Sequence, residues 1–116
     1  MKFSAFLCLC VLFLFLFSCS KKEEKIPADI IPKKIMVQLL VDYHLAESQT
    51  QLRSTVEDSK TLQHSYYKFI FTKYKTNFTQ FKKSFDFYSS HPEIFSKIYD
   101  EVITELSKKQ AEASKK

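Results

Sequence analysis

Apolar side chains recur every three or four residues along four successive stretches of this chain, and this spacing constrains the fold more than any other feature. Residues three and four apart lie on one side of an α-helix, so the spacing is typical of helices with one buried face. No stretch alternates apolar and polar residues, and no Asn-Gly or Asp-Gly pair marks a hairpin. Because the last three helices are joined by short connections, the sequence predicts an all-α fold, a small antiparallel bundle of about four helices.

The first two predicted helices differ in how their apolar residues are distributed. The first begins at Pro32, a residue suited to a first helical turn, and runs to about Arg53. Its apolar residues spread around most of the cylinder, so we expect it to be the most buried helix. The second runs from about residue 59 to 75 and is rich in aromatic residues. The residues predicted to share one broad face are Ile35, Met36, Leu39, Leu40, Tyr43 and Ala46 in the first helix, with Val37, Val41 and Leu45 around the rest of the cylinder. In the second helix, the residues predicted to share one side are Leu62, Tyr66, Phe69, Ile70 and Tyr74.

Polar residues at fixed spacing predict where the third and fourth helices begin. Asn77 and Gln80 have the spacing of a capping box, in which each side chain bonds the other residue's backbone N–H. Ser90 and Glu93 repeat this spacing around Pro92. We expect the fourth helix to fray into a basic tail at its end. The predicted buried residues are Phe78, Phe81, Phe85 and Tyr88 in the third helix, and Ile94, Phe95, Ile98, Tyr99, Val102, Ile103 and Leu106 in the fourth.

The N-terminus is typical of a bacterial lipoprotein signal peptide. Lys2 precedes an unbroken apolar run, residues 5–17, which is shorter than the roughly 20 residues of a membrane-spanning helix. Ser18 supplies the small residue that signal cleavage requires before Cys19. We therefore expect Cys19 to become the first residue of the mature chain and to carry lipid. The two other cysteines each follow a Leu inside the apolar run, which makes them weaker alternatives.

Removing residues 1–18 from the 116 leaves 98, enough for one small domain. Cys8 and Cys10 leave with the signal peptide, so the mature protein should have no disulfide and no thiol nucleophile. The charged block before Pro27 should form a flexible tether. The predicted organisation is a signal peptide (1–18), the lipidated Cys and tether (19–29), the helical domain (30–107) and a basic tail (108–116).

The composition argues against most common enzyme classes. The chain contains no Gly, which phosphate-binding loops, dinucleotide fingerprints and the nucleophile elbow of hydrolases all require. The net charge of +5 falls to +4 without Lys2 and is spread along the chain. Such a distribution indicates a solvated surface and no nucleic-acid partner. We therefore expect no enzymatic activity, no catalytic residues and no cofactor.

Asp42, His44 and Glu47 are the most suggestive polar group, because carboxylates and imidazoles are metal ligands and acid-base groups. Residues two apart on a helix point about 200° apart, so Asp42 and His44 cannot meet at one ion. His44 and Glu47, three apart, can meet. Two ligands are too few for a tight metal site, which favours hydrogen bonds or ion pairs that fix helix packing. A metal or catalytic role for His44 and Glu47 is the alternative.

Phe81, Ser84 and Tyr88 form a second candidate group in the third helix. They are interpreted as a helix seam in which one small residue allows close approach, and the alternative is a recognition stripe. Phe71 and Phe87 lie away from the main faces of their helices. They belong either to a satellite core or to a binding patch.

The stretch from Asp42 to Glu47 reads Asp-Tyr-His-Leu-Ala-Glu. In this stretch above all, the chain resembles small Bacteroidetes lipoproteins whose conserved domain has no known function. One departure is the turn at residues 75–77, where that family is expected to place a Gly; Asn77 tolerates the left-handed conformation. The resemblance implies an all-helical envelope lipoprotein and no activity. The other matching residues are Ile31, Pro32, Met36, Leu40, Val41, Tyr74, Phe81, Ser84, Tyr88, Pro92, Ile98, Tyr99 and Val102.

These observations lead to three functional hypotheses. The first is a lipid-anchored outer-membrane module that binds or scaffolds another envelope protein. The second is a metal-binding or enzymatic lipoprotein that uses His44 and Glu47. The third is binding of a small apolar ligand or lipid within the aromatic-rich bundle. The stretch Lys22-Glu23-Glu24 resembles the export signal of Bacteroidetes surface lipoproteins, or is an ordinary charged linker, so both the periplasmic and the cell-surface face remain open.

Overall fold

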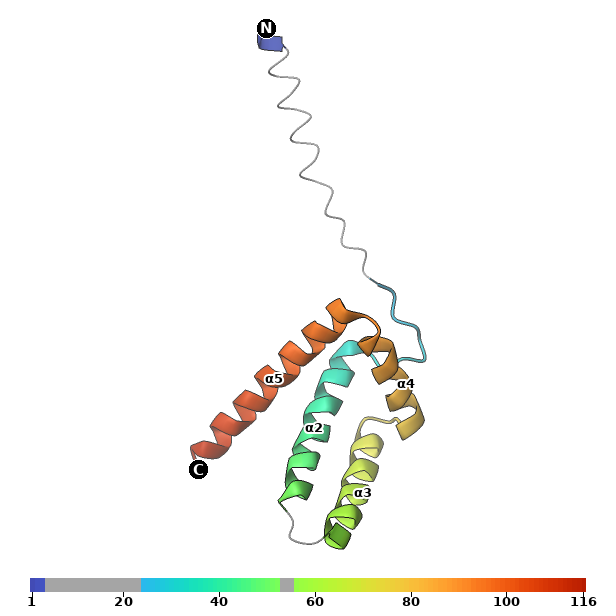
Figure 1. Ribbon diagram of the computed structural model, residues 1–116, viewed down its shortest axis with the longest axis vertical. Coiled ribbons are helices and arrows are strands. Elements are labelled where there is room, and N and C mark those ends of the chain that lie inside the picture. Colours follow the sequence, from blue (N-terminus) through green and yellow to red (C-terminus); the bar gives the residue numbers. More distant parts are fainter. Residues whose placement is uncertain (4–23, 53–55) are drawn as a thin grey trace.

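The computed structural model describes residues 1–3, 24–52 and 56–116 (Figure 1). The predicted signal-peptide cleavage site, Cys19 and the first part of the predicted tether lie outside these described residues. Within them, the fold is all-α and contains four long helices and no strand, as the sequence predicts. The helices are α2 (Lys33–Gln51), α3 (Val56–Lys73), α4 (Phe78–Ser89) and α5 (Pro92–Ser114).

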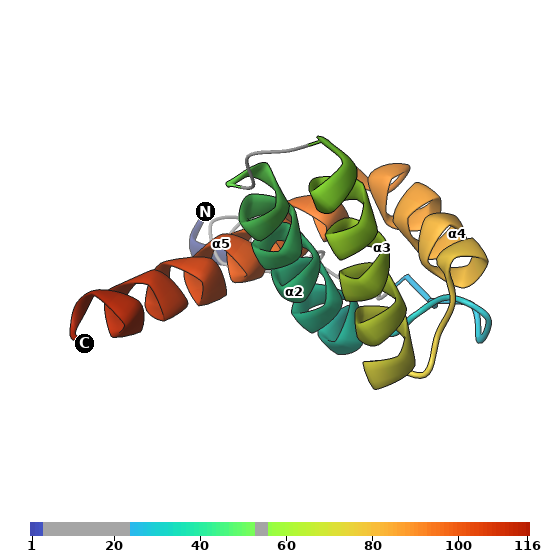
Figure 2. The ribbon, with the colours of Figure 1, turned by 90° about the horizontal axis from the view of Figure 1, so that it is seen from below.

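Helix α2 is the centre of the bundle, packing against α3 on one side and α5 on the other, while α4 packs against α5 (Figures 1 and 2). Met36, Leu39, Leu40 and Val41 are at most 2% exposed. These residues point in several directions around α2, and this helix can bury them only because neighbours lie on more than one side. The prediction that the first helix is the most buried is confirmed. No helix among the described residues is long and apolar enough to cross a membrane.

Four residues assigned to buried faces are instead exposed, namely Ile35, Phe69, Phe78 and Ile103. Each lies at the margin of the apolar stripe on its helix, and the neighbouring helix covers the middle of that stripe. Phe69 and Phe78 are more than half exposed, at 65% and 62%. The helical spacing therefore predicted which residues share a side but not how far the neighbouring helix extends over that side.

The turn between α3 and α4 shows that the predicted capping box is half correct. Asn77 is the N-cap of α4, and its Oδ1 accepts a hydrogen bond from the backbone N–H of Gln80 at 2.8 Å. The reciprocal bond was wrong, because the Gln80 side chain instead accepts from the Thr76 hydroxyl and donates to the carbonyl of Asp29. The left-handed residue of this turn is Lys75, with φ of 53°, whereas Asn77 is extended. The turn thus forms without Gly.

The second predicted cap, at Ser90, was also wrong. Helix α5 begins at Pro92, so its N-cap is His91, whose side chain makes no capping bond. Ser90 is the C-cap of α4, and its hydroxyl donates to the carbonyl of Asp86. The short connection leaves Ser90 one residue too early to cap α5, and it satisfies a terminal carbonyl of α4 instead.

Helix α5 continues to Ser114, so the expectation that its end frays into the basic tail at residues 108–116 was wrong. Residues 107–116 are exposed, and Figure 2 shows this end of α5 extending away from the other helices. The segment consists largely of Ala, Glu, Lys, Gln and Ser, of which the first four are strong helix formers. The helix propensity of these residues therefore extends α5 beyond the part that packs against the other helices.

Candidate functional site

The segment that enters the domain is clamped onto α4 by two buried side chains. The backbone N–H of Ile31 donates to Ser84 Oγ at 2.9 Å, and the Tyr88 hydroxyl donates to the carbonyl of Ile31 at 2.6 Å. Ser84 in turn donates to the carbonyl of Gln80. Ser84 and Tyr88 are fully buried, and burial raises the pKa of the Tyr88 phenol. The backbone N–H and the carbonyl of Ile31 are thus both hydrogen-bonded inside the domain, where an unpaired backbone group would be costly.

Charged contacts continue this attachment toward the N-terminus. Asp29 pairs with Lys83, whose hydrogen bond lowers the pKa of the Asp29 carboxyl. His91 Nε2 lies 2.9 Å from Glu24 Oε1, and His91 Nδ1 lies 2.6 Å from the carbonyl of Phe87. The chain from Glu24 to Ile31 therefore contacts α4 and the turn after it, although residues up to 29 were expected to form a flexible tether.

Asp42 connects α2 to α3. One carboxylate oxygen, Oδ2, accepts from Lys73 Nζ at 2.7 Å and from the Tyr74 hydroxyl at 2.8 Å. The pKa of Lys73 is raised, chiefly by its hydrogen bond to Asp42, and the pKa of Tyr74 is raised by burial and then by Asp42. Asp42 is thus committed to contacts between helices.

His44 faces α5, which packs on the side of α2 away from α3. Its Nδ1 lies 3.3 Å from Glu47 Oε2, and its Nε2 lies 3.5 Å from the hydroxyl of Tyr99 on α5. Asp42 takes no part in these contacts, as the helical geometry predicted. Burial, followed by the negative charge of Glu47, raises the pKa of Tyr99. Among the described residues, no three His, Cys, Asp or Glu side chains come together as a metal would require.

Six ring side chains from three helices, His44 among them, form a closed circuit of ring contacts. Successive ring centroids are 4.8 to 6.2 Å apart. Tyr67 of α3 extends the circuit, stacking on Tyr43 at 4.9 Å with an interplanar angle of 2°. Such contacts stabilise the fold beyond the burial of apolar area. In order, the circuit consists of Tyr43, His44, Tyr99, Phe95, Phe85 and Phe81.

The remaining candidate residues have structural contacts. Phe81 is buried and lies against Phe71, which also contacts Phe78. Phe87 packs on Tyr88 and on the ring of His91. The sequence singled out Phe81, Ser84 and Tyr88 by their spacing alone. Its helix-seam interpretation did not include the hydrogen bonds of Ser84 and Tyr88 to the entering segment.

Raising the pH above about 10 is expected to destabilise the domain. Burial raises the pKa of Tyr74, Tyr88 and Tyr99 above the ordinary 10.0, and burial followed by hydrogen bonding to Tyr67 raises that of Tyr43. The folded state holds these phenol protons more tightly than the unfolded state does. Their stabilising contribution is therefore complete below pH 10 and is lost as the pH rises through the folded-state pKa values.

Urea unfolding midpoints measured between about pH 7 and 11 test this prediction. The urea midpoint should be constant up to about pH 9.5 and should fall above it as the tyrosines lose their protons. This fall should be smaller in Tyr43→Phe. An unchanged alkaline decrease in Tyr43→Phe would show that this phenol does not contribute.

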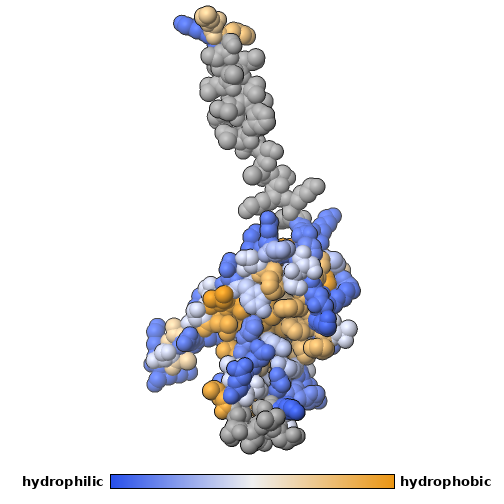
Figure 3. All heavy atoms as spheres, viewed as in Figure 1, coloured by the Kyte–Doolittle hydropathy of each residue, from blue (hydrophilic) through white to orange (hydrophobic). Residues whose placement is uncertain are grey.

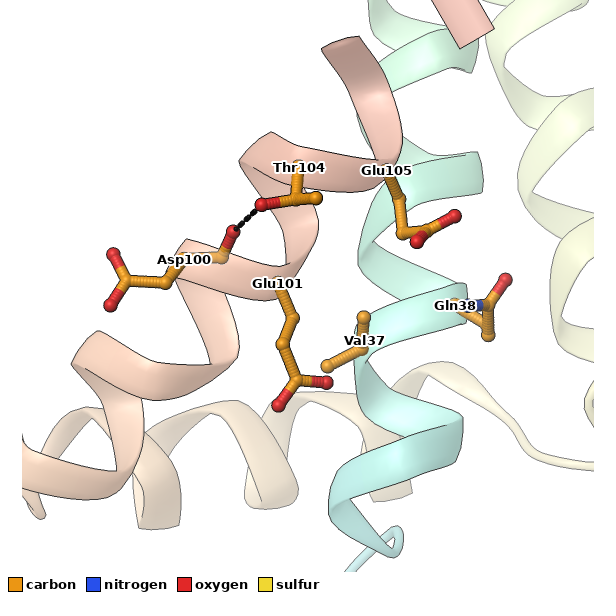
Figure 4. A pocket seen from close by; sticks show the side chains of 6 residues that line it. All are labelled: Val37, Gln38, Asp100, Glu101, Thr104 and Glu105. Carbon is orange, nitrogen blue, oxygen red and sulfur yellow. Dashed lines mark hydrogen bonds between the residues drawn. The ribbon is translucent and has the colours of Figure 1, made fainter. Parts of the chain in front are cut away.

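Two grooves lie beside α2. The groove between α2 and α5, about 240 Å³, is lined mostly by polar residues, and Figure 4 shows Glu101 and Glu105 directed from α5 toward α2. Both carboxylates already have partners, Glu101 with Lys33 at 2.8 Å and Glu105 with Lys108 at 2.9 Å. The groove between α2 and α3, about 230 Å³, is mainly apolar. It is lined by Asp42, Leu45, Ala46, Gln49, Tyr66, Phe69, Ile70 and Lys73.

Comparison with protein families gives one match. The family described as Domain of unknown function (DUF4296) matches residues 27–112. The chain belongs to this family. The DUF4296 match includes the four helices almost entirely and begins within the segment that Ser84 and Tyr88 hold. Searches of curated proteins and of solved structures found no significant match.

Proposed function

We propose that this protein is a lipid-anchored helical module of the outer membrane that binds another protein of the cell envelope. The observation that carries the proposal is the clamp on Ile31, made by Ser84 and Tyr88. The apolar run and the Ser18-Cys19 junction favour lipidation at Cys19, only a short stretch of chain before this clamp. A lipid at that position would hold the domain close to the membrane through α4.

A binding role is supported by the way the domain uses its polar and apolar side chains. Asp42 is engaged in contacts between helices, and His44 lies against Glu47 and Tyr99. By contrast, large apolar side chains remain at the surface, as Figure 3 illustrates for one face of the helical body. Exposed apolar surface of this kind is typical of interaction sites.

Replacing Cys19 by Ala is expected to abolish acyl labelling and to leave unprocessed precursor, because the lipid is attached to this thiol. Metabolic labelling with a palmitate analogue, followed by membrane fractionation and a salt wash, measures both effects. The wild-type protein should stay in the membrane fraction through the wash, since a multiply acylated N-terminus binds bilayers stably. Cys10→Ala is the matched control and should label normally. Equal labelling of Cys19→Ala and wild type would refute the anchor.

A further inference from the structure

We propose that Glu24 and His91 form a pH-sensitive latch, which holds the N-terminal segment to the turn between α4 and α5 when His91 is protonated and releases it when His91 is neutral. The pairing stands on the geometry of these two side chains alone. Its effect on the distance between the domain and the membrane rests on the proposed lipid anchor at Cys19.

Both ring nitrogens of His91 lie within hydrogen-bond distance of an acceptor. Nδ1 lies 2.6 Å from the carbonyl oxygen of Phe87, and Nε2 lies 2.9 Å from Glu24 Oε1. A carbonyl cannot donate a hydrogen bond, and neither can an ionised carboxylate. A neutral imidazole has one N–H, whereas an imidazolium has two. Only the protonated ring therefore makes both hydrogen bonds, and a neutral ring turns a lone pair toward one of the two oxygens.

The neutral ring is expected to keep its bond to Phe87 and to lose Glu24. The Phe87 carbonyl belongs to the last turn of α4, so the helix fixes its position. Glu24 instead lies in a segment without regular secondary structure, which Figure 1 shows beside α4. Its side chain is 51% exposed and can turn to water without disturbing the helices. Deprotonation of His91 thus releases the segment and leaves the turn in place.

The charged groups around His91 come from three parts of the fold. The N-terminal segment contributes Glu24, and α4 contributes its last carbonyls and Asp86, which pairs with Lys82. Helix α5 contributes its N-terminus and Glu93 in its first turn. Among the described residues, the carboxylate that forms an ion pair with His91 is that of Glu24. Because the partial charges of the two helix ends have opposite signs, the full charge of Glu24 decides how the segment responds.

The rest of the N-terminal segment stays attached when the latch opens. Asp29 pairs with Lys83, and the hydrogen bond from Lys83 lowers the pKa of the Asp29 carboxyl, so both stay charged from about pH 5 to 8. The hydrogen bonds of Ile31 to Ser84 and Tyr88 involve no group that titrates in this range. Release therefore stops at Asp29.

Opening the latch lengthens the link between the anchor and the domain. With Glu24 held, only residues 20–23 separate Cys19 from the attached chain. Histidine ordinarily changes charge between about pH 5 and 8, so raising the pH through this range releases Glu24. The link then gains residues 24–28, which span at most about 17 Å when extended. We expect the domain to stand closer to the membrane at acidic pH than at neutral pH.

The test measures the distance from the segment to α5 in the mature lipidated chain, held in nanodiscs of zwitterionic phosphatidylcholine. Nitroxide labels on Lys25→Cys and Ser96→Cys, both at exposed positions, report this distance by double electron–electron resonance. A short, narrow distribution is expected at about pH 5.5, and a longer, broader one at about pH 8. The short population should fall several-fold, since an ion pair at the surface is weak.

Variants identify the two groups responsible. Glu24→Gln should remove the pH response, because an amide can accept from the protonated ring and donate to the neutral one. His91→Lys stays cationic at pH 8 and should keep the short distance at both pH values. Glu93→Gln in the first turn of α5 and His64→Ala, an exposed histidine on α3, are the matched controls and should respond as the wild type does. Circular dichroism melts check that each variant folds, and Glu24 lies outside the helices.

The same distance at both pH values, or a pH response retained in Glu24→Gln, would overturn the latch. Energy transfer from a dye on Ser96→Cys to labelled lipid headgroups should fall as the pH rises in the wild type but not in His91→Lys. A pH-dependent latch with constant energy transfer would reject the change in distance from the membrane. Normal acyl labelling of Cys19 without a pH response would reject the latch and leave the anchor in place. If labelling shows no anchor, the same distances in the Cys19→Ser chain in buffer decide the latch.

Discussion

Replacing Ile98 by Asp is expected to unfold the domain. Ile98 is 0% exposed and belongs to the core that α5 forms with the other helices. The substitution removes apolar burial and places a carboxylate where it has neither water nor a partner, at a cost of several kcal/mol. A domain of this size has about 5–10 kcal/mol of stability in total. Thermal melts followed by circular dichroism should show loss of the cooperative transition.

Ile103→Asp is the matched control, because it makes the same change on the same helix. Ile103 is 59% exposed, so the new carboxylate stays hydrated and the expected cost is about 0.5 kcal/mol. The sequence pattern alone placed both isoleucines on the apolar half of the helix, and only the structure separates them. Similar melting of Ile98→Asp and Ile103→Asp would contradict the burial assigned to α5.

Regular helical geometry explains which parts of the fold could be predicted. Four helices follow from spacings of three and four, because one helical face must be apolar to pack. The same geometry separated Asp42 from His44, since residues two apart point to different neighbours. The structure places Asp42 against α3 and His44 against α5. Local backbone rules were therefore sufficient for these features.

Contacts between distant residues explain what could not be predicted. Ser84 and Tyr88 bond to Ile31, 53 and 57 residues away, and nothing in their own helix indicates that partner. The aromatic circuit likewise needs the relative placement of α2, α4 and α5. The exposure of Phe69 depends on how much of its helix face α2 covers. The continued helix after Leu106 is different, because its composition already favoured a helix.

Tyr88→Phe is expected to weaken the clamp on the N-terminal segment with little change in packing. The substitution removes only the hydroxyl, which leaves the buried carbonyl of Ile31 without its 2.6 Å hydrogen bond. The expected loss is about 1–3 kcal/mol of unfolding free energy, the usual cost of an unsatisfied buried acceptor. Tyr67→Phe is the control, because its hydroxyl accepts from Gln63 at a half-buried position and should matter less.

Ser84→Ala tests the other half of the clamp, because it leaves the Ile31 N–H without an acceptor. Once either bond is lost, the segment can detach and expose both polar groups of Ile31 to water, so the second substitution removes less. The double variant Ser84→Ala/Tyr88→Phe should therefore lose less unfolding free energy than the sum of the losses in the two single variants.

Amide hydrogen exchange at Ile31 should accelerate in every one of these variants, while exchange in the middle of α2 should follow only the global stability. Strict additivity together with unchanged exchange at Ile31 would show that Ser84 and Tyr88 act independently and do not hold the segment. If the clamp instead behaves as a unit, it is the point at which a pull on the N-terminal chain reaches the core through α4.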